Sequence, residues 1–250
     1  MTDHETVTVV TGAGRGIGAA TALHLARTGH DLAPSYLSDE DSAAEVLEAV
    51  RAEGARAVAV HGDVTDDGDV EALFAAAADL GPVTGLVANA GLTAHLGDLA
   101  DTPSETVRRV IDVNLLGVIL CARRAAQVMS TSRGGPGGAI VNISSAAATL
   151  GSPHDYVHYA AAKAGVDALT VGLAKELADQ GVRVNAVAPG MIRTGIHAAA
   201  GDPDRLERVV TRIPMSRVGE PTEIAPAVAW LLSDEASYVT GTVLRAAGGM

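Results

Sequence analysis

A tyrosine and a lysine stand four positions apart in the segment Tyr159-Ala-Ala-Ala-Lys163. Four positions are about one helical turn, so in a helix the two side chains share one face. A free tyrosine phenol has a pKa of about 10 and is a poor acid at neutral pH. A neighbouring ammonium stabilises the phenolate and lowers that pKa. The pair therefore predicts a tyrosine that acts as a general acid and base. Tyr156 lacks such a partner, because Ala160 stands four residues after it.

Further polar groups follow apolar segments that we predict to be strands. Ser144 and Ser145 follow residues 139–143, Asn89-Ala90-Gly91 closes another apolar run, and Pro189-Gly190 follows a third. In doubly wound sheets, ligands bind at the carboxyl ends of the strands. A serine hydroxyl at this edge can hydrogen-bond a substrate oxygen. We therefore expect these groups to meet the tyrosine and the lysine in one site.

A glycine-rich turn lies between the predicted first strand and first helix, in the segment TGAGRGIG over residues 11–18. Free amides at a helix N-terminus favour a phosphate, and the absence of side chains lets a pyrophosphate approach the backbone. An ordinary tight turn is the alternative, and the register Gly14-x-Gly16-x-x-Ala19 also fits the fingerprint. The position between strand and helix favours dinucleotide binding by Gly12, Gly14, Arg15, Gly16, Ile17 and Gly18.

The end of the predicted second strand bears on the choice of cofactor. An acid that binds the ribose 2′-hydroxyl should lie there, about 20 residues after the glycines. The strand instead ends in Ser35-Tyr36-Leu37-Ser38, and the first carboxylate is Asp39. Arg15, in the glycine turn, is placed to meet a 2′-phosphate. We therefore predict NADP(H) rather than NAD(H), and the sequence predicts no metal site.

The elements that must position these groups alternate between strand and helix along the chain. We predict strands over 6–11, 31–35, 56–61, 84–88, 139–143, 182–187 and 242–245, and helices over 16–28, 39–53, 66–80, 103–113, 115–132, 157–180 and 222–233. This alternation predicts an α/β fold: a Rossmann-type, doubly wound parallel sheet of about seven strands with helices on both faces. We expect one domain over residues 1–250, with a partly helical substrate lid at about 191–220.

Composition excludes several other functions. The chain of 250 residues has a net charge of −12 and only 2% aromatic residues, which disfavours nucleic-acid binding. The single cysteine, Cys121, stands in an apolar helical segment and suits a reducing compartment. We expect no signal peptide and no membrane span, and hence a cytoplasmic protein.

Taken together, these motifs resemble those of the short-chain dehydrogenases/reductases, over essentially the whole chain. The resemblance rests on Thr11 to Gly18, Asp63-Val64, Asn89-Ala90-Gly91, Asn114, Ser145, Tyr159, Lys163, Pro189-Gly190 and Thr194. It implies an oxidoreductase that transfers a hydride between a nicotinamide and a carbonyl or alcohol, with a small-molecule substrate and a homotetrameric assembly. The interval from serine to tyrosine is slightly longer than usual, which leaves Ser144 open beside Ser145, although the motif alignment favours Ser145 as the catalytic serine.

The resemblance also implies individual roles. Tyr159 is the acid and base, Lys163 binds the nicotinamide ribose and lowers the pKa of the tyrosine, and Ser145 holds the carbonyl. Asn114 fixes a helix distortion and a water in a proton relay. Asp63 and Val64 hold the adenine, Asn89, Ala90 and Gly91 shape the cofactor site, and Pro189, Gly190, Ile192 and Thr194 line the nicotinamide.

The substrate stays open between several classes. The resemblance includes 3-oxoacyl-acyl-carrier-protein reductases and sugar dehydrogenases, and a regulator that binds nucleotide without catalysis is the alternative from another class. A carrier protein is acidic and needs a basic docking patch, for which Arg123, Arg124 and Arg133 are the candidates. The net charge favours a free small ketone or sugar. We expect His95, Leu96, His154, Met191, Ile196, His197 and Met215 to form the substrate pocket.

Overall fold

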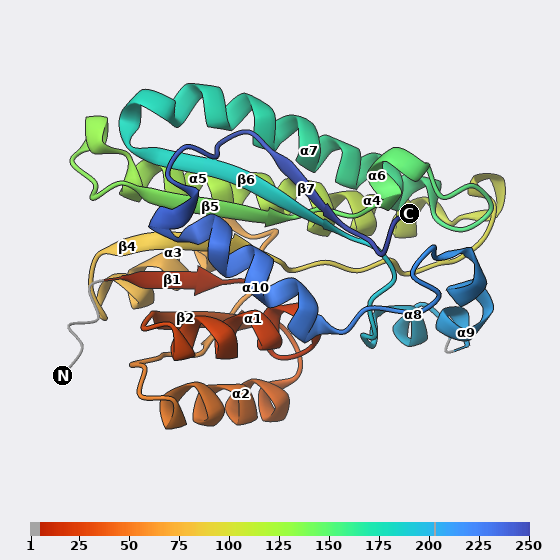
Figure 1. Cartoon of the computed structure of the whole chain (residues 1–250), viewed down its shortest axis with the longest axis horizontal. Coiled ribbons are helices and arrows are strands. Elements are labelled where there is room, and N and C mark those ends of the chain that lie inside the picture. Colours follow the sequence, from red (N-terminus) through yellow and green to blue (C-terminus); the bar gives the residue numbers. More distant parts are fainter. Residues whose placement is uncertain (1–5, 203) are drawn as a thin grey trace.

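The computed structural model describes residues 6–202 and 204–250. Seven strands form one parallel sheet in the order β3-β2-β1-β4-β5-β6-β7 (Figure 1). The strands are β1 (Val7–Val10), β2 (Asp31–Tyr36), β3 (Val60–His61), β4 (Val83–Ala88), β5 (Gly138–Ile143), β6 (Val182–Pro189) and β7 (Val243–Ala246). The chain order reverses between β1 and β4, which is the switch point where ligands bind in such sheets. The doubly wound sheet predicted from the alternation of elements is confirmed.

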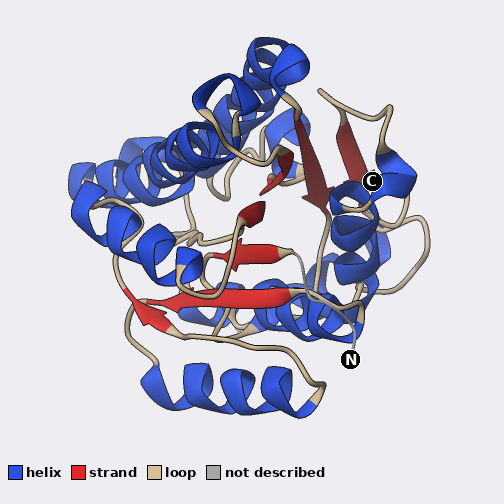
Figure 2. Cartoon of the chain, turned by 90° about the vertical axis from the view of Figure 1, so that its left-hand side faces the viewer, coloured by secondary structure: helices blue, strands red, loops and turns tan. Residues whose placement is uncertain are grey.

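Helices cover both faces of the sheet, as Figure 2 shows end-on. The helices are α1 (Gly16–Arg27), α2 (Glu40–Ala52), α3 (Asp67–Ala78), α4 (Ser104–Ile111), α5 (Gly117–Met129), α6 (Ala147–Leu150), α7 (Val157–Leu177), α8 (Ile196–Ala199), α9 (Arg205–Val209) and α10 (Pro221–Leu232). Helices α1, α2 and α10 bury their apolar residues on one face, and α3, α5 and α7 bury theirs on the other. No helix in the described ranges is long and apolar enough to cross a membrane.

The edge of the sheet at β3 is shorter than the sequence predicted. Residues 56–61 were expected to form a strand, but only Val60–His61 pair fully with β2, after an isolated bridge between Leu32 and Ala57. Pro34 lies in β2 between these two pairings. Proline has no N–H to donate to a neighbouring strand. The missing donor therefore explains why the pairing is interrupted at this point.

The core is built from small and branched aliphatic side chains. Cys121 lies in α5 within the cluster between the sheet and helices α3, α5 and α7, where it is 1% exposed. Burial raises the pKa of its thiol to about 12. A thiol that stays protonated is a poor nucleophile, which agrees with a packing role for this cysteine.

The segment from residue 191 to residue 220 leaves the sheet after β6 and carries the short helices α8 and α9 (Figure 1). One more short helix was not foreseen from the sequence: α6 begins four residues after the end of β5 and precedes α7. Both additions lie at the end of the molecule where β4, β5 and β6 terminate, beside the groups predicted to form the site.

Candidate active site

One large cavity, of about 580 Å³, opens at the carboxyl edge of the sheet. Among the predicted site residues, those that line it are Gly12, Gly14, Arg15, Gly16, Ile17, Ser35, Tyr36, Asp63, Val64, Asn89, Ala90, Gly91, Asn114, Ser145, Tyr159, Lys163, Pro189, Gly190, Ile192 and Thr194. Gly18 is the exception, because it is buried beneath the glycine turn. Residues that are up to 182 positions apart in the sequence, Gly12 and Thr194, therefore meet around one space, as the strand ends predicted.

The glycine turn has no room for a side chain at Gly12 or at Gly18. Gly12 has a positive φ of 63°, and a Cβ there would lie 2.9 Å from the Cα of Ala90. A Cβ on Gly18 would lie 2.5 Å from Nδ2 of Asn89. Helix α1 begins at Gly16 without a side-chain cap, so its first amides are available to an anion. The turn is thus a close cradle at the positive end of a helix.

Asn89 and Thr11 hold this cradle against the end of β4. The Asn89 side chain donates to the carbonyls of Thr11 and Gly12 at 2.9 and 3.0 Å, and the Thr11 hydroxyl accepts from the amides of Asn89 and Ala90. These bonds join the first and fourth strands at the switch point. The motif Asn89-Ala90-Gly91 therefore shapes the cavity by fixing the backbone of the glycine turn against the end of β4.

The end of β2 carries no carboxylate that faces the cavity unengaged. Ser35 is buried, and its carbonyl accepts from the amide of Ala13 at 2.9 Å. Asp39 lines the cavity but caps α2, and its two oxygens accept from the amide and the hydroxyl of Ser42 at 3.1 and 2.8 Å. These bonds, together with the charge of Arg15, lower the pKa of Asp39. Arg15 is exposed at the mouth.

Asp63 lies across the cavity from the glycine turn, with its oxygens shared between two neighbours. One oxygen accepts from the amide and hydroxyl of Thr65, and the other accepts from the Arg109 guanidinium at 3.2 Å. Partial burial opposes ionisation, but the Thr65 bonds and Arg109 outweigh it and lower the pKa of Asp63. The loop that carries Asp63 and Val64 is therefore anchored to α3 and α4.

Tyr159 and Lys163 lie on one face of α7 with the lysine Nζ 5.8 Å from the centre of the phenol ring. The ammonium donates to the carbonyl of Ile143 at 2.8 Å. Burial lowers the pKa of Lys163 to about 8, although the charge of Asp167 raises it. Burial raises the pKa of Tyr159, and hydrogen bonding with Ser145 only partly opposes this. The lowered tyrosine pKa expected from the lysine is therefore not found in the protein alone, because burial outweighs the hydrogen bond with Ser145.

The two serines after β5 have different surroundings. Ser144 is 2% exposed, and its hydroxyl donates to a carboxylate oxygen of Asp167 and lies 3.3 Å from the carbonyl of Lys163. Ser145 is beside Tyr159, and its hydroxyl also accepts from the amide of Ala147 at the start of α6. The geometry therefore favours Ser145 over Ser144 as the hydroxyl that meets a substrate.

Asn114 occupies a π-helical turn, Asp112–Leu116, between α4 and α5. The sequence predicted two helices here, and the structure joins them through this wider turn. The Asn114 side chain donates to the carbonyls of Leu92 and Val110 at 2.7 and 2.9 Å, and it accepts from the amide of Leu92. Such turns often occur at functional sites. The helix distortion expected at Asn114 is present, and it ties α4 to the loop after β4.

The substrate end of the cavity differs in part from the sequence prediction. Met191 and Ile196 line it, while His95, Leu96, His154 and Met215 do not. His154 is exposed and pairs with Asp98, and Met215 is 58% exposed. The His197 side chain lies outside the described residues. Sequence reasoning missed Leu150 and Tyr156, which do line the cavity. Tyr156 could have been found only from its place three residues before Tyr159, a spacing with no chemical signature of its own.

These features fit a nicotinamide dinucleotide. The tightly packed glycine turn, the uncapped start of α1 and the cavity that runs from there to Tyr159 match a pyrophosphate at one end and a reacting ring at the other. The fold and the site together define an α/β oxidoreductase of the dinucleotide-binding class.

Comparisons with known proteins specify the family. A family model described as enoyl-(acyl carrier protein) reductase, of the short-chain alcohol dehydrogenase type, matches residues 12–250. The chain is 45% identical to an uncharacterised oxidoreductase, YgfF, of Escherichia coli, over 97% of this chain and 99% of that protein. It is also 45% identical to 3beta-hydroxysteroid dehydrogenase 1 of Eggerthella lenta, over 97% of this chain and 92% of that protein.

A solved structure agrees with these matches. The short-chain type dehydrogenase/reductase of Mycobacterium marinum superimposes with a TM-score of 0.91 at 32% identity, covering 98% of this chain and 94% of that chain. The chain therefore belongs to the short-chain dehydrogenase/reductase family. It is an oxidoreductase of the kind that acts on CH–OH and C=O groups, in a family whose members bind a nicotinamide cofactor.

Proposed function

We propose that this protein is an NADP(H)-dependent oxidoreductase of the ketoreductase and alcohol dehydrogenase type, with Tyr159 as general acid and base. The observation that carries the proposal is the meeting of Ser145, Tyr159 and Lys163 on one wall of the cavity that begins at the glycine turn. Each group has a different chemical capacity, and a carbonyl substrate needs all three.

The protein groups divide the reaction among them. Bound nicotinamide supplies the hydride in reduction and accepts it in oxidation. The Ser145 hydroxyl donates a hydrogen bond to the carbonyl oxygen of the substrate. The Tyr159 phenol donates its proton to that oxygen, and its raised pKa keeps it protonated for this step at neutral pH. The Lys163 ammonium stabilises the phenolate that remains. In oxidation the proton returns from the alcohol to Tyr159.

The preference for NADP(H) rests on the surroundings of the adenine ribose. The end of β2 places Ser35 and Tyr36 at the cavity, and both oxygens of Asp39 accept bonds from Ser42 in capping α2. The Asp39 carboxylate is thus already engaged in capping its own helix, which disfavours it as a bidentate partner of the ribose hydroxyls. The exposed guanidinium of Arg15 supplies the positive charge that a 2′-phosphate needs.

The substrate in this proposal is a free, small carbonyl compound rather than one carried by an acidic protein. Of the basic residues that could dock such a carrier, Arg123 pairs with Asp67 at 3.0 Å and Arg124 lies 3.7 Å from Glu71. Two of the three candidates, Arg123 and Arg124, are thus matched by acids, which weakens their attraction to an acidic partner. The apolar side chains at the substrate end, Leu150, Met191 and Ile196 among them, favour an apolar ketone over a sugar.

The test is turnover of a panel of ketones, diketones and sugars with NADPH and with NADH, followed by loss of reduced nicotinamide absorbance. We expect NADPH oxidation with apolar ketones, its loss in Tyr159→Phe and Ser145→Ala, and retention of NADPH binding in both variants. Ser144→Ala is the matched control and should retain the activity. Nucleotide binding without any turnover would contradict the proposal and favour a regulator.

The assembly and the location follow the family resemblance as proposals. Exposed apolar side chains on α5 and α7, Ile119, Val157 and Val171 among them, suit a homotetramer that packs through these helices. The single reduced cysteine suits the cytoplasm. Cell fractionation tests the cytoplasmic location.

A further inference from the structure

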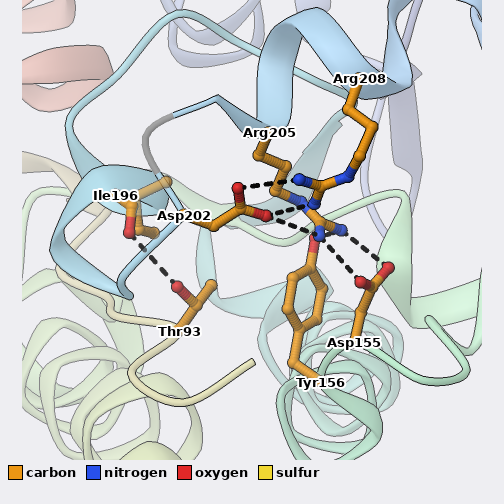
Figure 3. Close-up of polar contacts among 7 residues, drawn as sticks. All are labelled: Thr93, Asp155, Tyr156, Ile196, Asp202, Arg205 and Arg208. Atoms are coloured by element: carbon orange, nitrogen blue, oxygen red, sulfur yellow. Dashed lines mark hydrogen bonds and ion pairs between the residues drawn. The ribbon is translucent and has the colours of Figure 1, made fainter. Parts of the chain in front are cut away.

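The segment over residues 191–202 and 204–220, hereafter the lid segment, is attached to the start of α7 by a buried arginine. The Arg205 side chain, at the beginning of α9, is only 3% exposed. Its guanidinium makes a bidentate pair with Asp155, with both N···O distances at 2.8 Å (Figure 3). A guanidinium and a carboxylate in this parallel arrangement form one of the strongest and most directional side-chain contacts.

The same guanidinium also contacts Tyr156. It donates to the Tyr156 hydroxyl at 3.2 Å, and its central carbon lies 4.8 Å from the centre of the Tyr156 ring. Figure 3 shows the ring lying below the guanidinium, between Asp155 and the lid segment. The Tyr156 ring in turn meets the Tyr159 ring edge-on, with centres 5.2 Å apart. One cation of the lid segment is thus two contacts away from the proposed acid.

Two hydrogen bonds tie the loop after β4 to the start of α7 and to the lid segment. The amide of Gly97, in the loop after β4, donates to the carbonyl of Asp155 at 2.8 Å. The Thr93 hydroxyl, from the same loop, donates to the carbonyl of Ile196 in α8 at 3.4 Å (Figure 3). The loop after β4, the start of α7 and the lid segment therefore enclose the substrate end of the cavity together, and Asp155 is the residue where they converge.

The geometry points to Arg205 as a positioning residue that fixes the lid segment over the substrate and sets Tyr156 as the wall of the substrate site for an uncharged carbonyl compound. This inference rests on the proposed function and deepens it. Arg205 does not itself line the cavity, whereas Tyr156 does. The carboxylate of Asp155 neutralises the guanidinium, so a substrate meets an aromatic ring at this wall and no free cation.

The test compares Arg205→Met with Arg208→Met. Arg208 lies three residues further along the same segment, is 60% exposed and pairs with Asp202, which itself lies 3.9 Å from Arg205. Within the described part of the chain, Arg208 has no hydrogen bond to Asp155 or Tyr156. We expect Arg205→Met to raise the KM for an apolar ketone about tenfold, the factor for the loss of one strong contact that positions the site. The kcat and the Kd for NADPH should change less than about twofold, because Ser145, Lys163 and the glycine turn lie on other elements.

A second readout does not depend on turnover. Trypsin cuts after arginine, and the lid segment also contains Arg193, Arg212 and Arg217. We expect faster tryptic cleavage at these sites in Arg205→Met than in Arg208→Met, because only the first variant loses the contact that holds the lid segment to Asp155. The two variants are comparable because each loses one cleavage site. Arg205→Lys, which keeps the charge but not the bidentate pair, should fall between wild type and Arg205→Met in both measurements.

Tyr156→Phe provides a variant that keeps the ring and removes only the hydroxyl bond. It should raise the KM about threefold, less than Arg205→Met does because the bidentate pair of Arg205 with Asp155 remains, and this test holds even if Arg205→Met does not fold. Equal KM values and equal cleavage rates for Arg205→Met and Arg208→Met would overturn the inference. A wild-type protein without turnover would overturn the proposed function instead, and the cleavage rates would then decide on Arg205 by themselves.

Discussion

Lys163 gives the reaction a pH dependence that can be assigned to one residue. Its pKa is lowered to about 8 by burial, so the ammonium is lost as the pH rises through that value. Reduction needs this cation beside the phenolate that forms on Tyr159. We expect kcat for ketone reduction to be constant below about pH 7 and to fall about tenfold per pH unit well above pH 8.

A pH profile of kcat with saturating NADPH measures this limb. Lys163→Arg keeps a positive charge at all pH values tested, so any activity that it retains should lack the fall above pH 8. A profile of Lys163→Arg that still falls with the midpoint of the wild type would assign the limb to another group.

Arg15 carries the predicted choice between the two nicotinamide cofactors. Arg15→Ala removes the cation beside the proposed 2′-phosphate and should raise the KM for NADPH about tenfold or more, with little change for NADH. Arg27→Ala is the control, because Arg27 is an exposed arginine at the other end of α1 that pairs with Glu53. Equal losses with NADPH and NADH would mean that Arg15 binds the phosphates common to both cofactors.

Individual residues were predictable where the chemistry fixes a spacing. Tyr159 and Lys163 were found from one helical turn, and the glycines from their place between strand and helix. Ser145 was favoured over Ser144 only by motif alignment, because the structural distinction depends on which hydroxyl Asp167 accepts from, across 23 positions of sequence. Arg205 was not foreseen at all, since a single arginine in an irregular segment has no pattern.

At the level of elements, the π-helical turn between α4 and α5 depends on one side chain. Asn114→Ala would leave the buried carbonyls of Leu92 and Val110 and the amide of Leu92 without their partner. We expect a loss of about 2 to 4 kcal/mol in the free energy of unfolding, since each unsatisfied buried group costs about 1 to 3 kcal/mol. Chemical denaturation measures this change in the free energy of unfolding. Gln127→Ala, at a partly exposed position on α5, is the near-neutral control.

The element boundaries show where sequence patterns stop being informative. Strand and helix order followed from apolar periodicity, and all seven strands were placed. The β3 edge was overestimated because the missing N–H of Pro34 acts on a neighbouring strand, which one-dimensional patterns do not include. The π-helical turn was predicted as a break between two helices. One extra residue in a helical turn shifts the phase of the apolar pattern, and the start of a separate helix has the same effect.

At the scale of the whole molecule, the exposed apolar face of α5 and α7 predicts assembly. Ile119 and Val171 are 36% and 38% exposed. We expect the wild type to sediment at four times the monomer mass and the double variant Ile119→Asp, Val171→Asp to sediment as smaller species, because buried charge opposes association. Leu99→Asp, at an exposed position away from these helices, is the control. A monomeric wild type would contradict the proposal.

The buried cysteine allows opening of the core to be followed by thiol reactivity. Cys121 lies on the buried face of α5 and is 1% exposed, and its pKa of about 12 keeps it as a thiol. Alkylating reagents react with thiolates that they can reach, so the native chain should resist them while the unfolded chain does not. Under excess reagent, the rate of alkylation at this one position would time the opening of the core, without any added label or cofactor.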